Sequence, residues 1–162
     1  MKIVFLDADS IGRDIDLSAF SDIGETVIYG NTPEDKISER ISDAEVIIIN
    51  KQEINERTVG SARNLELVCI TATGINNLDT EYLDRKGIAW RNVANYSTED
   101  VAQHTFALMF ALLEHLPYYD EYVKSGKYVD DVCFSHFGMN FHELHGMTWG
   151  IIGMGNIGKR VA

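Results

Sequence analysis

The chain has 162 residues, of which 45% are hydrophobic, and this is enough to build a buried core. It carries 14 basic and 25 acidic residues, for a formal net charge of −11, and has no run of lysine or arginine. Nucleic acids and anionic membranes bind clustered positive charge, so neither is an expected partner.

The two cysteines, Cys69 and Cys133, form neither a disulfide framework nor a zinc-binding spacing. Cys69 lies within the apolar run "LELVCI", which favours a buried, unreactive thiol. The start "MKIVFLDADS" does not resemble a signal peptide, and "FALMFALL" is too short to cross a bilayer. These features predict a cytoplasmic protein without a metal site.

Short apolar segments alternate with helical patterns over the first 95 residues. Strands are expected at 2–6, 25–29, 45–49, 65–70 and 87–90. Several are apolar on consecutive residues, as in strands covered on both faces. One helix is expected to begin at Thr32 as N-cap with Pro33 in its first turn, and another to end at Gly87. This alternation predicts an α/β fold with a doubly wound parallel sheet.

Residues 97–116 differ from the segments before them. Ser97 and Asp100 have the spacing of a capping box. Apolar side chains then recur at helical spacing on two faces, so the helix should connect two domains or pack against a second subunit. Pro117 should end or kink the helix, and residues 118–146 should form an irregular arm.

The end of the sequence contains the pattern GxGxxG. A predicted strand at 147–152 leads into Gly153, Gly155 and Gly158, and a helical pattern follows. In such a loop the glycines permit a tight turn, a close approach to a pyrophosphate, and close helix–strand packing. An ordinary strand-to-helix turn is the alternative. The acidic residue that binds the adenine ribose, expected about 20 residues later, would fall beyond Ala162.

Four blocks then match one family in order: "INKQEI" (49–54), "ITATGINNLD" (70–79), "KGIAWRNVANYSTEDVAQHT" (86–105) and "ELHGMTWGIIGMGNIGKRVA" (143–162). The chain resembles the front half of the NAD-dependent D-isomer-specific 2-hydroxyacid dehydrogenases, especially their glycerate/hydroxypyruvate and phosphoglycerate dehydrogenase branch. The resemblance implies a flavodoxin-like substrate domain (1–96) and a bridging helix and arm that build a dimer (97–146). It also implies the start of a Rossmann NAD-binding domain (147–162).

The resemblance also implies site residues. The backbone N–H groups of Thr73 and Gly74 would bind the substrate carboxylate, with Lys51 nearby and Tyr96 in the pocket wall. The cofactor would lie against Val101, Thr105, Gly153, Met154, Gly155, Asn156, Ile157 and Gly158. Simpler roles are open for several of these residues: a positive-φ turn at Gly74, a solvated Lys51, and packing at Tyr96, Val101 and Thr105.

Catalysis in the family uses an arginine, a glutamate and a histidine that follow the glycine loop. None of the histidines here occupies that position, and surface or structural roles are expected for His104, His115, His136, His142 and His145. The implied reaction is hydride transfer between NAD(H), with NADP not excluded, and a small 2-hydroxy or 2-keto acid. The implied assembly is a homodimer through 97–116, with the 162-residue chain inactive by itself.

Three other interpretations compete with this one. "VFLDADSI" resembles a haloacid-dehalogenase phosphatase motif, with Asp7 as nucleophile, Asp9 as general acid and Thr71 on phosphate, although solvated aspartates are the simpler explanation. A phospho-receiver domain fails because Asn50 occupies the phospho-acceptor position. A non-catalytic flavodoxin-like domain that dimerises through 97–116 stays open.

Overall fold

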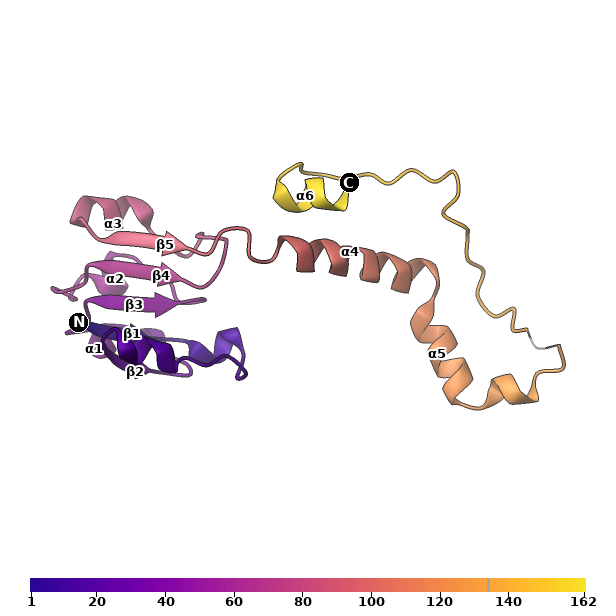
Figure 1. Cartoon of the computed structure of the whole chain (residues 1–162), viewed down its shortest axis with the longest axis horizontal. Helices are drawn as coiled ribbons and strands as arrows, with labels where there is room; N and C mark the ends of the chain where they lie inside the picture. Colours follow the sequence, from indigo (N-terminus) through magenta and orange to yellow (C-terminus); the bar gives the residue numbers. More distant parts are fainter. Residues whose placement is uncertain (134) are drawn as a thin grey trace. The chain divides into compact units, whose positions relative to one another are not determined.

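The computed structural model describes residues 1–133 and 135–162, and the chain divides into two compact units, Met1–Ala94 and Asn95–Ala162 (Figure 1). The elements of the first unit are β1 (Lys2–Phe5), η1 (Ala8–Ile11), η2 (Ser18–Asp22), β2 (Glu25–Ile28), α1 (Glu34–Arg40), β3 (Val46–Ile49), α2 (Glu56–Val59), β4 (Leu67–Ile70), α3 (Thr80–Lys86) and β5 (Ala89–Asn92). Those of the second are α4 (Thr98–Leu113), α5 (Leu116–Lys124), η3 (Lys127–Asp130) and α6 (Asn156–Val161).

The first unit contains a parallel five-stranded sheet in the order β2-β1-β3-β4-β5. This is the strand order of flavodoxin-like folds, and it confirms the predicted α/β class. All five predicted strands are present. β5 begins two residues later than expected, at Ala89, because Gly87 ends α3 and the Ile88 N–H still donates to the Leu83 carbonyl.

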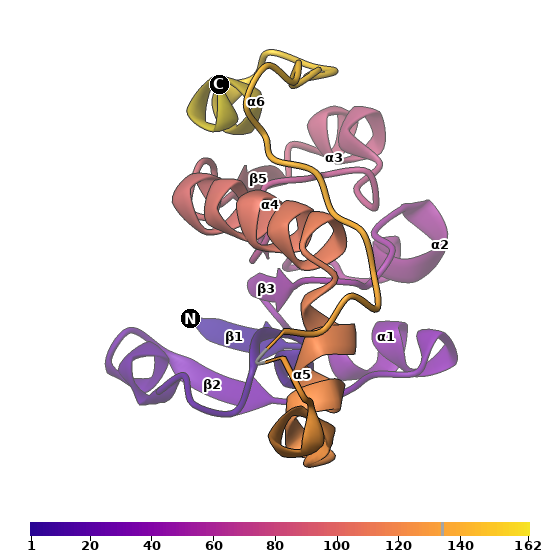
Figure 2. The same cartoon turned by 90° about the vertical axis from the view of Figure 1, so that its right-hand side faces the viewer.

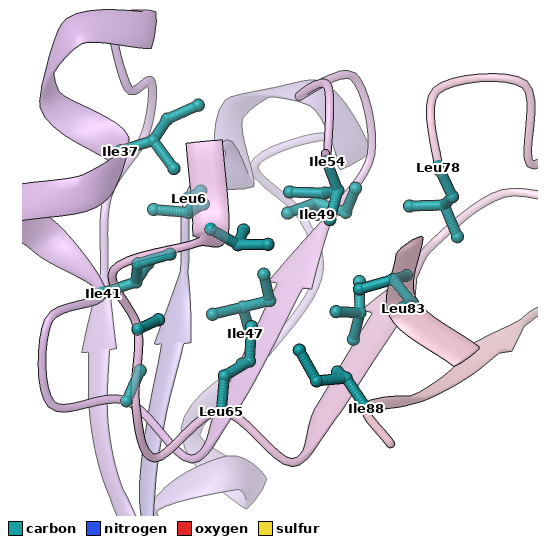
Figure 3. Close-up of a cluster of buried hydrophobic side chains, with 14 of the residues drawn as sticks. Leu6, Ile37, Ile41, Ile47, Ile49, Ile54, Leu65, Leu78, Leu83 and Ile88 are labelled. Atoms are coloured by element: carbon teal, nitrogen blue, oxygen red, sulfur yellow. The ribbon is translucent and has the colours of Figure 1, made fainter. Parts of the chain in front are cut away.

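Helices α1, α2 and α3 cover one face of the sheet (Figure 2). The strands direct alternate side chains to this face, among them Leu6, Ile47 and Ile49, which meet Ile37 of α1 and Leu83 of α3 (Figure 3). Full burial of one such aliphatic side chain contributes about 1.5–3 kcal/mol, so this cluster is the main source of the first unit's stability.

The opposite face is packed around β1. Ile3, Phe5, Ala8 and Ile48 form a second cluster, which side chains of η1 and η2 cover. Cys69 is half-buried at its border, and burial raises the pKa of the thiol, which keeps it protonated and unreactive. Because both faces of the central strands are covered, β1 and β3 are apolar on consecutive residues.

The ends of two helices test the predicted caps. Gly87 is confirmed as the C-cap of α3, with a left-handed φ of 70°. Thr32 was wrongly expected to be an N-cap, because Pro33 occupies that position in α1. Thr32 is instead buried, and its hydroxyl donates to the carbonyl of Leu6 at 2.5 Å. It therefore joins the loop to the end of the β1 segment.

The helix expected over 97–116 is present as α4, but it ends at Leu113. The chain breaks at His115, whose φ is 50°, and Pro117 lies in the first turn of α5. The capping box expected at Ser97 is wrong, because its backbone is not extended and its side chain makes no capping hydrogen bond. In 1–133 and 135–162, no helix is both long and apolar enough to span a membrane.

The arm is more helical than predicted, since α5 and η3 occupy much of its first half. The strand predicted at 147–152 is also wrong: this segment pairs with no strand in the part of the chain that the structure describes. A parallel strand requires a neighbouring ladder, and apolar composition alone does not supply one. Trp149 stacks on Phe106 of α4 instead, with ring centroids 5.7 Å apart, while Ile152 is fully exposed.

We predict that Ile47→Ala lowers the free energy of unfolding of the first unit by about 2–5 kcal/mol, because it leaves a cavity in the larger cluster. Urea unfolding followed by circular dichroism measures this. Ile15→Ala is the matched control, because Ile15 is 50% exposed, and its cost should stay below about 0.5 kcal/mol. Equal losses in both variants would contradict this description of the core.

Candidate functional site

The carboxyl ends of β1, β3 and β4 meet at one edge of the sheet, because all three strands are parallel and adjacent. Lys51 follows β3, and Thr73 and Gly74 follow β4. The register pairs Ile49 with Ile70, so the two turns begin side by side. The fold thus brings three of the four predicted substrate residues to one edge of the first unit.

The turn at Thr73 and Gly74 has free amides. The Thr73 hydroxyl donates to the Val93 carbonyl at 2.9 Å, and the Asn92 side chain donates to the Thr73 carbonyl at 2.7 Å. Both residues are exposed, and their N–H groups meet no acceptor among residues 1–133 and 135–162. Two unpaired amides at a turn can bind a carboxylate without a cation.

Gly74 does not supply a left-handed turn. Its φ lies outside the positive range, and a Cβ placed there would meet nothing within 4 Å. The alternative that Gly74 permits a positive-φ turn is therefore wrong. The open space beside its amide leaves room for a ligand to approach the backbone, which accounts for a glycine here.

Asp7 lies two residues after β1, and it is buried rather than solvated as the sequence suggested, with 3% of its surface exposed. Its carboxylate accepts backbone N–H bonds from Asn50, Lys51 and Gln52. A nucleophile of the haloacid-dehalogenase type must be accessible to a phosphate, so this burial argues against that interpretation. Sequence reasoning missed the structural role of Asp7; the available signal was an acid directly after an apolar strand.

The glycine loop lies in the second unit. Gly153 has a φ of 99°, which favours glycine, and α6 begins at Asn156. A Cβ on Gly158 would lie 2.0 Å from the Gly153 carbonyl oxygen, so only glycine permits this close approach. A Cβ on Gly155 would meet nothing within 4 Å. A tight turn with one open backbone face fits a dinucleotide phosphate.

The glycine loop is attached to the start of α4. The Asn156 side chain donates to the Asn95 side chain at 2.5 Å, and Arg160 donates to Glu99 at 2.6 Å. Asn95 has a φ of 65°, a conformation that asparagine tolerates better than most residues. These two contacts were not predicted, and they fix the loop beside the first turn of α4.

Three predicted ligand contacts lie on or next to α4. Tyr96, just before the helix, and Val101 are exposed, and Thr105 is half-buried. The Thr105 hydroxyl donates to the Val101 carbonyl at 2.7 Å, within its own helix. The structure leaves Tyr96 and Val101 accessible; their contact with a ligand stays a prediction.

An apolar groove of 740 Å³ runs beside α4 within the second unit. Its walls come from α4, residues 144–151 and the end of α6, and include Phe106, Phe110, Leu113, Trp149 and Ile151. The groove lining contains no titratable side chain. The groove therefore offers apolar contacts and no side chain for proton transfer.

The arm contains a cluster of aromatic and titratable side chains. Tyr122 stacks on His136 with ring centroids 3.6 Å apart, and its hydroxyl donates to Asp131. The hydroxyl of Tyr118 is 2.7 Å from Nε2 of His136. All five histidines lie in the second unit, and the sequence predicts a role in proton transfer for none of them. Their structural role stays a prediction.

Comparison with known proteins identifies the relatives of this chain. Residues 3–148 match the model of the D-isomer specific 2-hydroxyacid dehydrogenase catalytic domain. The chain is 34% identical to a glycerate dehydrogenase of Methylorubrum extorquens, covering 99% of this chain and 51% of that protein. It is 30% identical to a hydroxypyruvate reductase of Blautia hydrogenotrophica, covering 98% of this chain and 51% of that protein.

The chain is also similar to a solved structure, in both sequence and fold. The D-lactate dehydrogenase of Aquifex aeolicus, complexed with NAD and lactic acid, is 26% identical and superposes with a TM-score of 0.77. The match covers 98% of this chain and 46% of that one. The chain therefore spans about half the length of the relatives it matches.

We predict that Tyr122 ionises late. Its hydrogen bond to the Asp131 carboxylate, which stabilises the neutral phenol, raises its pKa from 10.0 to about 12. The pKa is raised in the folded state, so this contact stabilises the arm below pH 10 and the stabilisation is lost as pH rises through about 12. Ultraviolet absorbance titration of wild type against Tyr122→Phe isolates this residue.

The matched variants are Asp131→Asn and Asp130→Asn. The first replaces the charged hydrogen-bond acceptor by a neutral amide and should lower the Tyr122 pKa, whereas the second removes only the weakest of the contributing charges. Equal effects of the two variants would contradict the assigned hydrogen bond.

Proposed function

The chain belongs to the D-isomer-specific 2-hydroxyacid dehydrogenase family, and from this we propose that it serves hydride transfer between a nicotinamide cofactor and a small 2-hydroxy or 2-keto acid. The observation that carries the proposal is the pair of unpaired amides at Thr73 and Gly74, exposed at the carboxyl edge beside open space. Ligands of open α/β sheets bind at this edge.

Within the proposed site, the amides of Thr73 and Gly74 bind the substrate carboxylate. Lys51 adds a positive charge on the neighbouring turn, and Tyr96 contributes to the pocket wall. The backbone groups hold the carboxylate in place, and the Lys51 charge adds to its affinity. This leaves the remainder of the substrate to be selected by other groups.

The proposed cofactor is NAD, with NADP as the alternative. When bound, it supplies or accepts the hydride. Gly153, Met154, Gly155, Asn156, Ile157 and Gly158 would hold its pyrophosphate, because the backbone is open at Gly155 and closely packed at Gly158. Val101 and Thr105 would lie on its nicotinamide side. The Aquifex aeolicus relative, solved with NAD, supports this choice.

Proton transfer is assigned to no residue of this chain. A keto acid that accepts a hydride forms an alkoxide, and this requires a proton from a group that titrates near neutrality. We assign the five histidines to surface or structural roles. The 162 residues by themselves are therefore proposed to be inactive.

A homodimer through residues 97–116 is part of the proposal, and the expected compartment is the cytoplasm. Leu108 and Leu112 of α4 are 53% and 74% exposed, an unusual exposure for two leucines on one helix. A second copy would remove this apolar surface from water. The same surface favours the second candidate function, a non-catalytic domain whose role is dimerisation.

The first test follows NADH oxidation by the protein as its gene encodes it, with hydroxypyruvate or glyoxylate as substrate. We expect oxidation with at least one of them. Gly74→Ala should raise KM about tenfold, because the methyl group enters the open space where the carboxylate binds and weakens charge-assisted hydrogen bonds. Asn76→Ala, an exposed position of the same loop, is the control.

Absence of any keto-acid reduction would favour the non-catalytic candidate. Reduction by the 162 residues alone would contradict the assignment of proton transfer to groups other than these residues.

A second test addresses the dimer. Leu112→Glu places a charge on the exposed apolar face of α4 and should convert the dimer to a monomer in light scattering coupled to size-exclusion chromatography. Gln103→Glu adds the same charge at an exposed polar position of the same helix and should leave the mass unchanged. A monomeric wild-type protein would refute the proposed assembly.

A further inference from the structure

A buried carboxylate lies next to the proposed substrate residues and has no role in the function proposed above. Asp7 is 3% exposed. Burial of a charged carboxylate is strongly unfavourable unless its oxygens are hydrogen-bonded. The role of Asp7 therefore follows from the groups that donate hydrogen bonds to its carboxylate.

Among residues 1–133 and 135–162, the N–H donors to this carboxylate all come from one turn, residues 50–52. Oδ2 of Asp7 accepts from the N–H groups of Lys51 at 2.6 Å and Gln52 at 3.2 Å. The Asn50 N–H is shared between the two carboxylate oxygens, at 2.9 and 3.0 Å. In the described parts of the chain, no cation forms an ion pair with Asp7. Its charge is compensated by the backbone of this turn.

The carbonyl side of the 50–52 turn is held as well. The Asn77 side chain donates to the Gln52 carbonyl at 2.7 Å and to the Asn50 carbonyl at 3.3 Å. The Gln52 side chain donates to the Thr32 carbonyl at 2.9 Å. The three amides of the turn and the carbonyls of Asn50 and Gln52 are thus bound to protein groups, which hold the backbone in place.

Unlike the backbone of this turn, the Lys51 side chain is not held in place. It is exposed and forms no ion pair or side-chain hydrogen bond with the residues that the structure describes. Its backbone N–H makes the shortest of the contacts to Asp7. The direction in which its Cα–Cβ bond points is therefore set by the carboxylate below it.

We infer that Asp7 is a positioning residue of the substrate site. It fixes the 50–52 turn, and through that turn it directs the Lys51 ammonium toward the anion bound at Thr73 and Gly74. The inference rests on the proposed function, because it presumes an anionic substrate at that edge. Asp7 itself does not touch the substrate.

The direction in which KM changes distinguishes this positioning role from a purely electrostatic effect of the Asp7 charge. The negative charge of Asp7 by itself repels an anion, so a variant that only removed this charge would bind the substrate more tightly and show a lower KM. Loss of the turn geometry has the opposite result. Asp7→Asn keeps the shape but leaves one neutral acceptor oxygen for the three N–H groups and places its NH₂ group against an N–H of the turn, which weakens the hold on the turn.

The experiment is a double-mutant cycle between Asp7→Asn and Lys51→Ala in the protein as its gene encodes it, with NADH and hydroxypyruvate. Asp7→Asn should raise KM about tenfold with little change in kcat, because a ground-state charge contact is lost. In the Lys51→Ala background the same substitution should have little further effect. Asp9→Asn, an exposed acid at the same edge, controls for the charge.

Asn77→Ala is the second variant, to be used if Asp7→Asn does not fold. It releases the same turn from its carbonyl side, and it should also raise KM in a manner that depends on Lys51.

An unchanged or lower KM in Asp7→Asn would overturn the inference, and so would an equal rise in both backgrounds, which indicates general destabilisation. Either result leaves the proposed function intact as long as the wild-type protein reduces a keto acid. A wild-type protein without such activity removes the proposed function and this inference together.

Discussion

Parallel pairing of β3 with β1 on one side and β4 on the other is the constraint on which the candidate site depends. It places every strand's carboxyl end at one edge, and so brings residues 7, 50–52 and 71–74 together although they are far apart in the sequence. The helices on one face and the 3₁₀ segments on the other hold these strands by apolar packing. The turns at the edge are then free to differ in chemistry without changes in the core.

The fold of the first unit could be predicted from sequence because its signals are local and periodic. Runs such as "EVIII" bury both faces of a strand, and Gly87 combines the end of a helical pattern with the residue best suited to a left-handed cap. Apolar composition, helical spacing and turn residues all act over a few neighbours. The resemblance to a known family then added the candidate site residues, whose contacts with ligands stay predictions.

The predictions that the structure contradicts failed because they depended on contacts that are distant in the sequence. Thr32 and Ser97 are residue types that commonly cap helices. Thr32 lies one residue before the N-cap of α1, and its hydroxyl binds a distant carbonyl. Ser97 occupies the N-cap position of α4, but its backbone is not extended and its side chain makes no capping hydrogen bond. Asp7 was expected in solvent because aspartate usually is. Its partners are backbone amides, which are present at every residue and leave no trace in composition. The segment 147–152 has the composition of a strand but lacks a ladder.

The shell around Asp7 has a consequence for how such a site can diversify. Within the described parts of the chain the carboxylate accepts only from main-chain N–H groups, so its contacts do not depend on which side chain other than proline occupies position 51. Lys51 can be exchanged for a shorter, neutral or aromatic residue while the scaffold that presents it persists. A single codon change would then alter the ligand repertoire of this edge without a folding defect, which makes position 51 a natural starting point for redesign.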